Sequence, residues 1–273
     1  MSRTTHLLVI DPQNDFCDIP GAALPVPGAD ADLHRLAGFI KGHAAALAGI
    51  TVTLDSHASV AVERTTFWLI RAGGAVAPFT FITAEQVRAG EFRPRDESLT
   101  PAVLSMLDQL AAAGRPGLVV WPVHCVTGTW GHNIHGALAD ALAAWELTHQ
   151  RAVRKVLKGE HPLTEHFGVF EADAPDAAVP TTLFNTALAA QVSAEGVELL
   201  LIAGQASSHC VAASYRQLAA YLKDKPRKPR LVILSDAMSP VPGFEPLADA
   251  FFAQARLDGA ELMTLEQAVG LLG

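Results

Sequence analysis

Strand-like and helix-like segments alternate along most of this 273-residue chain, and this alternation limits the folds that the sequence can adopt. Short apolar runs typical of buried strands cover residues 5–11, 49–57, 117–125, 151–159, 197–204 and 229–237. Segments with helical spacing of apolar residues cover 30–49, 100–114, 133–149, 210–222 and 247–260. Because no two-residue hairpin signal separates the strands, the pattern predicts an α/β fold with a mostly parallel sheet.

The alternation is interrupted between about residues 69 and 117. The part from 70 to 98 contains glycine, proline and charged residues and has only weak periodicity. We interpret 69–117 as an insertion or lid within a single domain that spans 1–273.

Composition excludes several classes of protein. Half of the residues are hydrophobic and 18% are charged, which is typical of a packed globular protein. The net charge is −8 and no basic stripe is present, so we expect no nucleic-acid partner. We also expect no membrane partner, because neither a signal peptide nor an apolar stretch of about 20 residues is found. Three widely spaced cysteines indicate no disulfide framework and favour a reducing, cytoplasmic location.

Polar side chains of catalytic types follow several of the strand-like runs. In a parallel α/β sheet, ligands bind outside the carboxyl ends of the strands. The side chains that we expect to meet there are Asp11, Asp55, His57, His124, Lys158 and Cys210.

Cys210 lies between the apolar run LLLIAG and the helix-like run CVAASYRQLAAYL. The peptide dipoles at a helix N-terminus favour a thiolate, and its free N–H groups can bind an oxyanion. A cysteine in an apolar context is nevertheless more often an inert core residue. A catalytic role therefore depends on Asp11 as the general base and on Lys158 as the cation that pairs with the thiolate.

The segment DSH places Asp55 and His57 on the same side of an extended chain. Together with His124 they suit a divalent transition metal with open water positions, and Glu63 is a candidate fourth ligand. An ordinary turn is the alternative for DSH alone. We expect three other histidines at the margin: His132 and His135 on the surface or beside the site, and His209 at its edge or directed away.

Two aromatic residues adjoin these segments. Phe16 follows the first strand, and Trp121 precedes Pro122 and His124. Either ring could stack on a flat substrate, and simple burial in the core explains each equally well.

In these segments the chain resembles the nicotinamidase and isochorismatase-like family of cysteine hydrolases, and its nicotinamidase branch in particular. The segments that carry the resemblance are LLVIDPQNDFCDIPGAALPVPGAD, TLDSH, WPVHCVTGTWGHNIH, VLKG, EHFGVFEAD, GQASSHCVAASYRQLA and LSDAMSP.

The resemblance implies a three-layer α-β-α fold with a six-stranded sheet. It implies Cys210 as the nucleophile with Asp11 and Lys158, and an oxyanion hole formed by the N–H groups of Ala206 and Cys210. A cis peptide between Gln205 and Ala206 would accompany this turn. The implied cofactor is a divalent metal on Asp55, His57 and His124. Zinc is the first choice, and iron and manganese are the alternatives.

The implied reaction is the release of ammonia from nicotinamide or a related heteroaromatic carboxamide, whose ring would lie between Phe16 and Trp121. The alternatives are an amidase for ureido or maleamate-like substrates, a vinyl ether hydrolase of the isochorismatase type, and a non-catalytic family member. The partner is therefore expected to be a small amide, and the sequence allows a homo-oligomer without indicating an interface.

Overall fold

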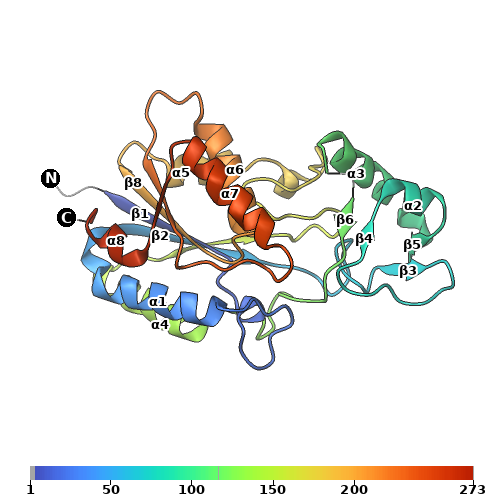
Figure 1. Cartoon of the computed structure of the whole chain (residues 1–273), viewed down its shortest axis with the longest axis horizontal. Helices are drawn as coiled ribbons and strands as arrows, with labels where there is room; N and C mark the ends of the chain where they lie inside the picture. The colour runs from blue at the N-terminus through green and yellow to red at the C-terminus, as the bar shows by residue number, and fades with distance from the viewer. Residues whose placement is uncertain (1–3, 116, 273) are drawn as a thin grey trace.

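A six-stranded, entirely parallel sheet forms the centre of the molecule (Figure 1). The computed structural model describes residues 4–115 and 117–272. Positions 1–3 and 273 of the expected domain, and 116 of the expected insertion, lie outside the described residues. The sheet order is β10-β9-β8-β1-β2-β7. Its strands are β1 (Thr5–Ile10), β2 (Leu47–Asp55), β7 (Arg154–Lys158), β8 (Leu199–Gly204), β9 (Arg230–Leu234) and β10 (Glu261–Met263).

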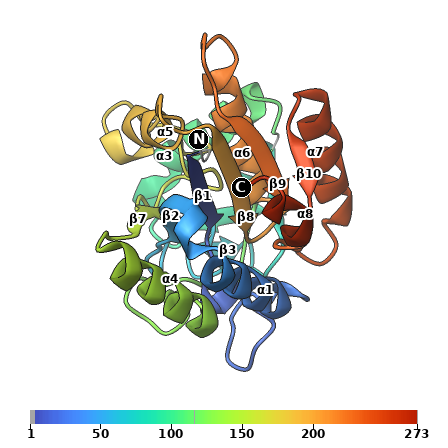
Figure 2. The ribbon, with the colours of Figure 1, turned by 90° about the vertical axis from the view of Figure 1, so that its left-hand side faces the viewer.

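Helices cover both faces of this sheet (Figures 1 and 2). One face packs against α1 (Ala29–Gly42), α4 (Gly136–His149) and α8 (Leu265–Val269). The other packs against α5 (Thr186–Val192), α6 (Cys210–Leu222) and α7 (Glu245–Leu257). Side chains alternate along a strand, so Leu7 and Val9 belong to the first core and Leu8 and Ile10 to the second. The expected three-layer α-β-α fold is confirmed.

The expectation of a sheet strand at 117–125 is wrong. Only β6 (Leu118–Val119) forms there, and it pairs antiparallel with β4 (Phe81–Ile82), away from the central sheet. Pro122 lacks the N–H that an inner strand needs, and Cys125 has a φ of 49°, so the segment cannot continue as a regular strand. The sixth strand is instead β10, which pairs with β9.

The segment 69–117 contributes most of a small lobe beyond the sheet (Figure 1). Its elements are β3 (Trp68–Ile70), β4, α2 (Ala84–Arg88), β5 (Phe92–Pro94), α3 (Thr100–Ala112) and β6. Met106 and Leu107 of α3 are buried with Val120 and Ala174, which lie outside the segment. The apolar cluster of the lobe is therefore built partly by the chain on either side of it.

The sheet strands run from the end that holds the first described residues toward the lobe, so their carboxyl ends face it (Figure 1). Among residues 4–115 and 117–272, no helix is long and apolar enough to cross a membrane.

Candidate active site

Strand register brings the predicted catalytic residues together. Asp55 at the end of β2 pairs directly with Lys158 at the end of β7. On the other side of β2, Asp11 follows β1, and its backbone N–H donates to the Thr53 hydroxyl at 3.0 Å. β8 pairs with β1 up to Gly204, so the turn to Cys210 begins beside Asp11. Four adjacent strands thus end at one site.

Lys158 lies at the centre of the polar contacts. Its Nζ is 3.0 Å from Asp11 Oδ2 and 2.8 Å from Asp55 Oδ1. It also donates to the His166 carbonyl oxygen at 2.9 Å and lies 3.7 Å from Cys210 Sγ. The ammonium therefore contacts the thiol and both carboxylates; its contact with Asp55 was not among the expectations from the sequence.

Burial and mutual charge set the ionisation of this group. Burial raises the pKa of Asp11, and the Lys158 ammonium only partly opposes it. Burial favours a neutral Lys158, but the charges of Asp11 and Asp55 raise its pKa well above the usual value. Burial also disfavours ionised Asp55, yet His57 and Lys158 lower its pKa well below the usual value. Lys158 and Asp55 are consequently charged, while Asp11 is poised to accept a proton.

Cys210 is the first residue of α6, as predicted, but its thiol is not biased toward the thiolate. Burial raises the pKa of Cys210 well above its usual value, and the negative charge of Asp11 adds to this despite Lys158. The expectation that the helix N-terminus favours a thiolate is therefore wrong for the site as it stands. The resting sulfur carries its proton and needs a base.

The turn between β8 and α6 depends on Gly204. Its φ is 118°, and a Cβ there would lie 1.9 Å from the Ile10 carbonyl oxygen, so only glycine fits. The predicted cis peptide between Gln205 and Ala206 is present. Within the described part of the chain, the N–H groups of Ala206 and Cys210 have no hydrogen-bond acceptor.

Asp55, His57 and His124 form a buried group of potential metal ligands, which we call the sheet-edge cluster. Asp55 Oδ2 lies 2.7 Å from His57 Nε2 and 3.6 Å from His124 Nε2. His124 Nδ1 lies 2.8 Å from the Pro122 carbonyl oxygen, and one Arg64 guanidinium nitrogen lies 2.5 Å from Nδ1 and 3.1 Å from Nε2. One carboxylate and two imidazoles at this spacing fit a divalent transition metal ion.

Glu63 lies outside this group. Its Oε1 is 3.0 Å from His57 Nδ1, whereas the other ring nitrogen, Nε2, faces Asp55. A histidine that binds a metal through one ring nitrogen typically hydrogen-bonds through the other to a carboxylate that does not itself bind the metal. We therefore expect Glu63 to orient His57 rather than to be the fourth ligand.

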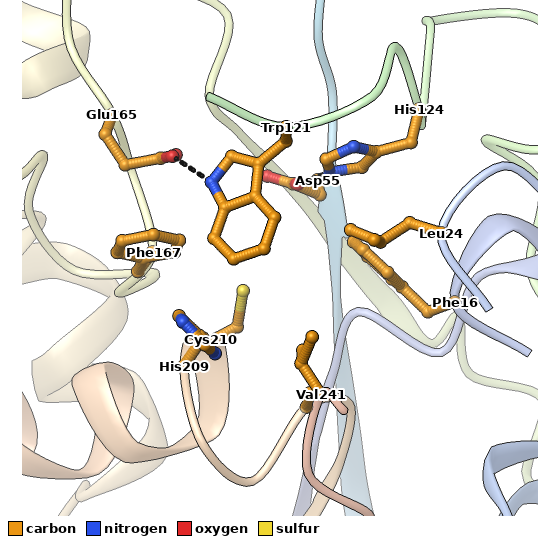
Figure 3. Close-up of a pocket in the computed structure, with 11 residues that line it drawn as sticks. Phe16, Leu24, Asp55, Trp121, His124, Glu165, Phe167, His209, Cys210 and Val241 are labelled. Carbon is orange, nitrogen blue, oxygen red and sulfur yellow. Dashed lines mark hydrogen bonds and ion pairs between the residues drawn. The ribbon is translucent and has the colours of Figure 1, made fainter. Parts of the chain in front are cut away.

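A cavity opens beside these groups (Figure 3). Phe16 and Trp121, both predicted to contact substrate, line it with Cys210, Asp55 and His124. The remaining lining residues are Leu24, Glu165, Phe167, Ala206, His209 and Val241. The wall is thus largely apolar and aromatic, and the Cys210 thiol and the candidate metal ligands Asp55 and His124 are among its polar groups.

Two buried charged residues at the site were not predicted. Glu165 accepts a hydrogen bond from Trp121 Nε1 at 3.1 Å, and burial together with the charge of Glu63 raises the pKa of Glu165 to about 7. Arg64 is fully buried, and one guanidinium nitrogen lies 2.5 Å from His124 Nδ1. Glu165 follows Lys158 by seven residues in a loop, and Arg64 directly follows Glu63. The only sequence signal for either residue was therefore its proximity to a residue already predicted to be in the site.

The three marginal histidines are placed as follows. His132 is buried beside the site and lies 2.8 Å from the Ser56 hydroxyl. His135 is also buried, and its Nε2 lies 2.9 Å from Asp30 Oδ1. A surface position is therefore wrong for both. His209 lines the cavity, with its ring 5.2 Å from that of Trp121, in agreement with an edge position.

Comparisons with known proteins agree on the fold. No protein-family model and no curated protein matches the chain. Among solved structures, yeast nicotinamidase Pnc1p is 19% identical with a TM-score of 0.63, over 95% of this chain and 99% of that one. The chain has the isochorismatase-like hydrolase fold.

Two further structures have the same fold. The pyrazinamidase of Pyrococcus horikoshii in complex with zinc is 20% identical, with a TM-score of 0.54 over 95% of this chain and 98% of that one. An isochorismatase family protein from Desulfovibrio vulgaris is 17% identical, with a TM-score of 0.55 over 98% of this chain and 97% of that one. At these identities the likeness concerns the fold, and the chemistry must be argued from the site.

Proposed function

We propose that this chain is an amidohydrolase that releases ammonia from nicotinamide or a related heteroaromatic carboxamide through a thioester on Cys210. The observation that carries the proposal is the contact of Lys158 Nζ with Asp11 Oδ2, Asp55 Oδ1 and Cys210 Sγ at the base of an apolar cavity. The solved nicotinamidase and pyrazinamidase of the same fold support this substrate class.

The steps follow from the ionisation of the site. Asp11 takes the thiol proton as Cys210 Sγ attacks the amide carbon, and Lys158 stabilises the forming thiolate. The N–H groups of Ala206 and Cys210 receive the developing oxyanion. Asp11 then returns the proton to the leaving nitrogen, which departs as ammonia and leaves a thioester. A water molecule loses a proton to Asp11, attacks the thioester, and releases the carboxylic acid and the reprotonated thiol.

A divalent metal, zinc first and iron or manganese as alternatives, would be held by Asp55, His57 and His124. When bound, the ion would supply a Lewis acid for a ring nitrogen of the substrate. The chain itself would orient the ring between Phe16 and Trp121. Glu165 would hold the indole of Trp121 through its N–H, and the segment 69–117 would act as an insertion or lid of a single domain.

The test is an ammonia-release assay across small carboxamides, with Cys210→Ala as the decisive variant. We expect the variant to lose activity toward heteroaromatic amides by at least about 10³-fold, because the nucleophile is gone. Cys17→Ala is the matched control, since burial raises the pKa of Cys17 to about 12 and the residue lies outside the cavity. Full activity of Cys210→Ala would overturn the mechanism.

The same screen separates the alternatives. Preference for ureido or maleamate-like amides would leave the mechanism intact and change the substrate. Activity on a vinyl ether that survives in Cys210→Ala would indicate isochorismatase chemistry. Metal binding without turnover of any of these compounds would favour a binding protein.

A further inference from the structure

A second Asp–His–His group lies outside the cavity, at the amino ends of α1 and α4. Asp30 and His34 are four residues apart on α1, so both side chains project from one face of that helix. His135 immediately precedes α4 and is brought to them by the packing of the two helices. We call Asp30, His34 and His135 the α1–α4 cluster.

The spacing of its donor atoms is that of a metal site. Asp30 Oδ1 lies 2.9 Å from His135 Nε2 and 3.4 Å from His34 Nδ1. The donors of a tetrahedral zinc ion, with bonds of about 2.0–2.1 Å, are about 3.3 Å apart. One ligand atom from each of the three residues lies within 4.8 Å of the others. The sheet-edge cluster likewise has one aspartate and two histidines, and its carboxylate lies at similar distances from its two imidazoles.

The local charge also favours a cation. Asp18 accepts hydrogen bonds from the N–H groups of Gly28 and Asp30, so the amino end of α1 is already capped by a carboxylate. Asp32, in the same first turn of α1, is paired with Arg35. Asp18 and Asp30 therefore contribute negative charge near the cluster, and neither is paired with a lysine or an arginine of residues 4–115 or 117–272.

We propose that the α1–α4 cluster is a second binding site for a divalent transition metal ion such as Zn²⁺ or Co²⁺. His34 and Asp30 coordinate from α1, His135 coordinates from the start of α4, and water fills the remaining position on the exposed side. Binding replaces the hydrogen bond between His34 Nδ1 and the Asp30 carbonyl oxygen, which is 2.9 Å long.

The ion would stabilise the fold and take no part in the reaction. It would join the two helices that cover one face of the sheet. His135 also donates its backbone N–H to the Pro12 carbonyl oxygen at 2.9 Å, so the ion would anchor the chain directly after Asp11. None of the three ligands lines the cavity.

The experiment is a titration of the metal-free protein with Co²⁺, followed by calorimetry and by visible absorption. We expect two ions per chain in the native protein and one in His34→Ala. An outer partner of a metal ligand contributes about 10–100-fold in affinity, and a direct ligand contributes at least as much. Because His34 is exposed, its replacement should leave the fold intact. Addition of Co²⁺ should also raise the melting temperature less in His34→Ala than in the native protein.

His43→Ala is the matched control, since His43 ends the same helix but lies outside the cluster. It should bind two ions, as the native protein does. The proposal would be overturned if the native chain bound no more ions than His34→Ala does, whatever the total, or if His34→Ala retained every ion with unchanged affinity. Neither result depends on amidase activity, so this proposal and the proposed function stand or fall separately.

Discussion

The sheet-edge cluster and the α1–α4 cluster each contain one aspartate and two histidines but differ in burial. In the first, the side chains of Asp55, His57 and His124 are 7%, 1% and 5% exposed. In the second, the side chain of Asp30 is 37% exposed and that of His34 is 58% exposed. An ion at the first cluster would therefore be shielded from water, whereas one at the second would exchange readily with solvent.

The partners of the ligands differ as well. In the sheet-edge cluster, Glu63 faces the outer nitrogen of His57, and both the Pro122 carbonyl oxygen and Arg64 contact His124 Nδ1. In the α1–α4 cluster, His135 Nδ1 is buried without a hydrogen-bond partner among the described residues. Outer partners fix the ring orientation and the tautomer of a metal-bound histidine. The two clusters therefore share the same ligand types but differ in the contacts that would orient a metal-bound histidine.

The largest expected difference between the clusters is in catalysis. Asp55→Ala removes a metal ligand and the partner of Lys158, so we expect kcat/KM for ammonia release to fall by at least about 10³-fold. Asp30→Ala, the corresponding change in the α1–α4 cluster, should leave kcat/KM close to that of the native protein. A similar loss in both variants would show that the two clusters are functionally coupled.

A smaller effect is expected from the outer partner Glu63. Glu63→Gln keeps the size of the side chain but removes the charge that faces His57, so affinity at the sheet-edge cluster should fall by about 10–100-fold. Competition with a chromophoric chelator measures this, and affinity at the α1–α4 cluster should not change. If Glu63 is itself a ligand, the absorption spectrum of Co²⁺ at the sheet-edge cluster will also change.

The exposure difference predicts the order in which the ions leave. On addition of EDTA to the loaded protein, the exposed ion should dissociate first, with full amidase activity retained until the second ion leaves. Stopped-flow release of Co²⁺, measured beside residual activity, tests this order. Loss of activity in step with the first ion would place the catalytic ion at the exposed cluster and contradict the comparison.

The sequence predicted the central sheet well wherever a strand is buried on both faces. Runs such as LLLIAG are apolar throughout because both faces of β8 are covered. β10 was missed because its three residues are only partly buried and lie at the edge of the sheet. The segment 117–125 was predicted as the sixth strand in its place. Its apolar residues are buried in the lobe and around the cavity, and composition alone does not distinguish such residues from those of a buried sheet strand.

For the site, sequence position was informative at strand ends and uninformative in loops. Asp11, Asp55 and Lys158 each close a strand, and parallel pairing then brings them together. Glu165 and Arg64 reach the site through the folding of loops, for which sequence spacing has no rule. The prediction that the Cys210 thiolate is favoured was wrong for a related reason, because burial and the charge of Asp11 raise the pKa of Cys210 despite its position at the helix end.

Metal affinity at the two clusters can be compared over a range of pH only where the protein stays folded. Protonation of His6 is expected to lower the stability of the fold in mild acid. His6 is buried in β1, where its Nε2 lies 2.9 Å from the Thr51 hydroxyl. Burial lowers the pKa of His6 to about 4. Between about pH 6.5 and 4 the unfolded chain therefore binds a proton that the folded protein does not, so stability falls as the pH falls through this window.

Lowering the pH from 7.5 to 5 should therefore reduce the free energy of unfolding by about 2 kcal/mol through His6 alone. Urea unfolding at the two pH values measures this loss. His6→Gln keeps a group that can hydrogen-bond to Thr51 but cannot titrate, so its stability should depend less on pH even if the variant is less stable overall. An equal loss in the variant would assign the acid sensitivity to other groups. In His6→Gln, metal release at pH 5 could then be attributed to the two clusters themselves, because the destabilisation caused by protonation of His6 would be absent.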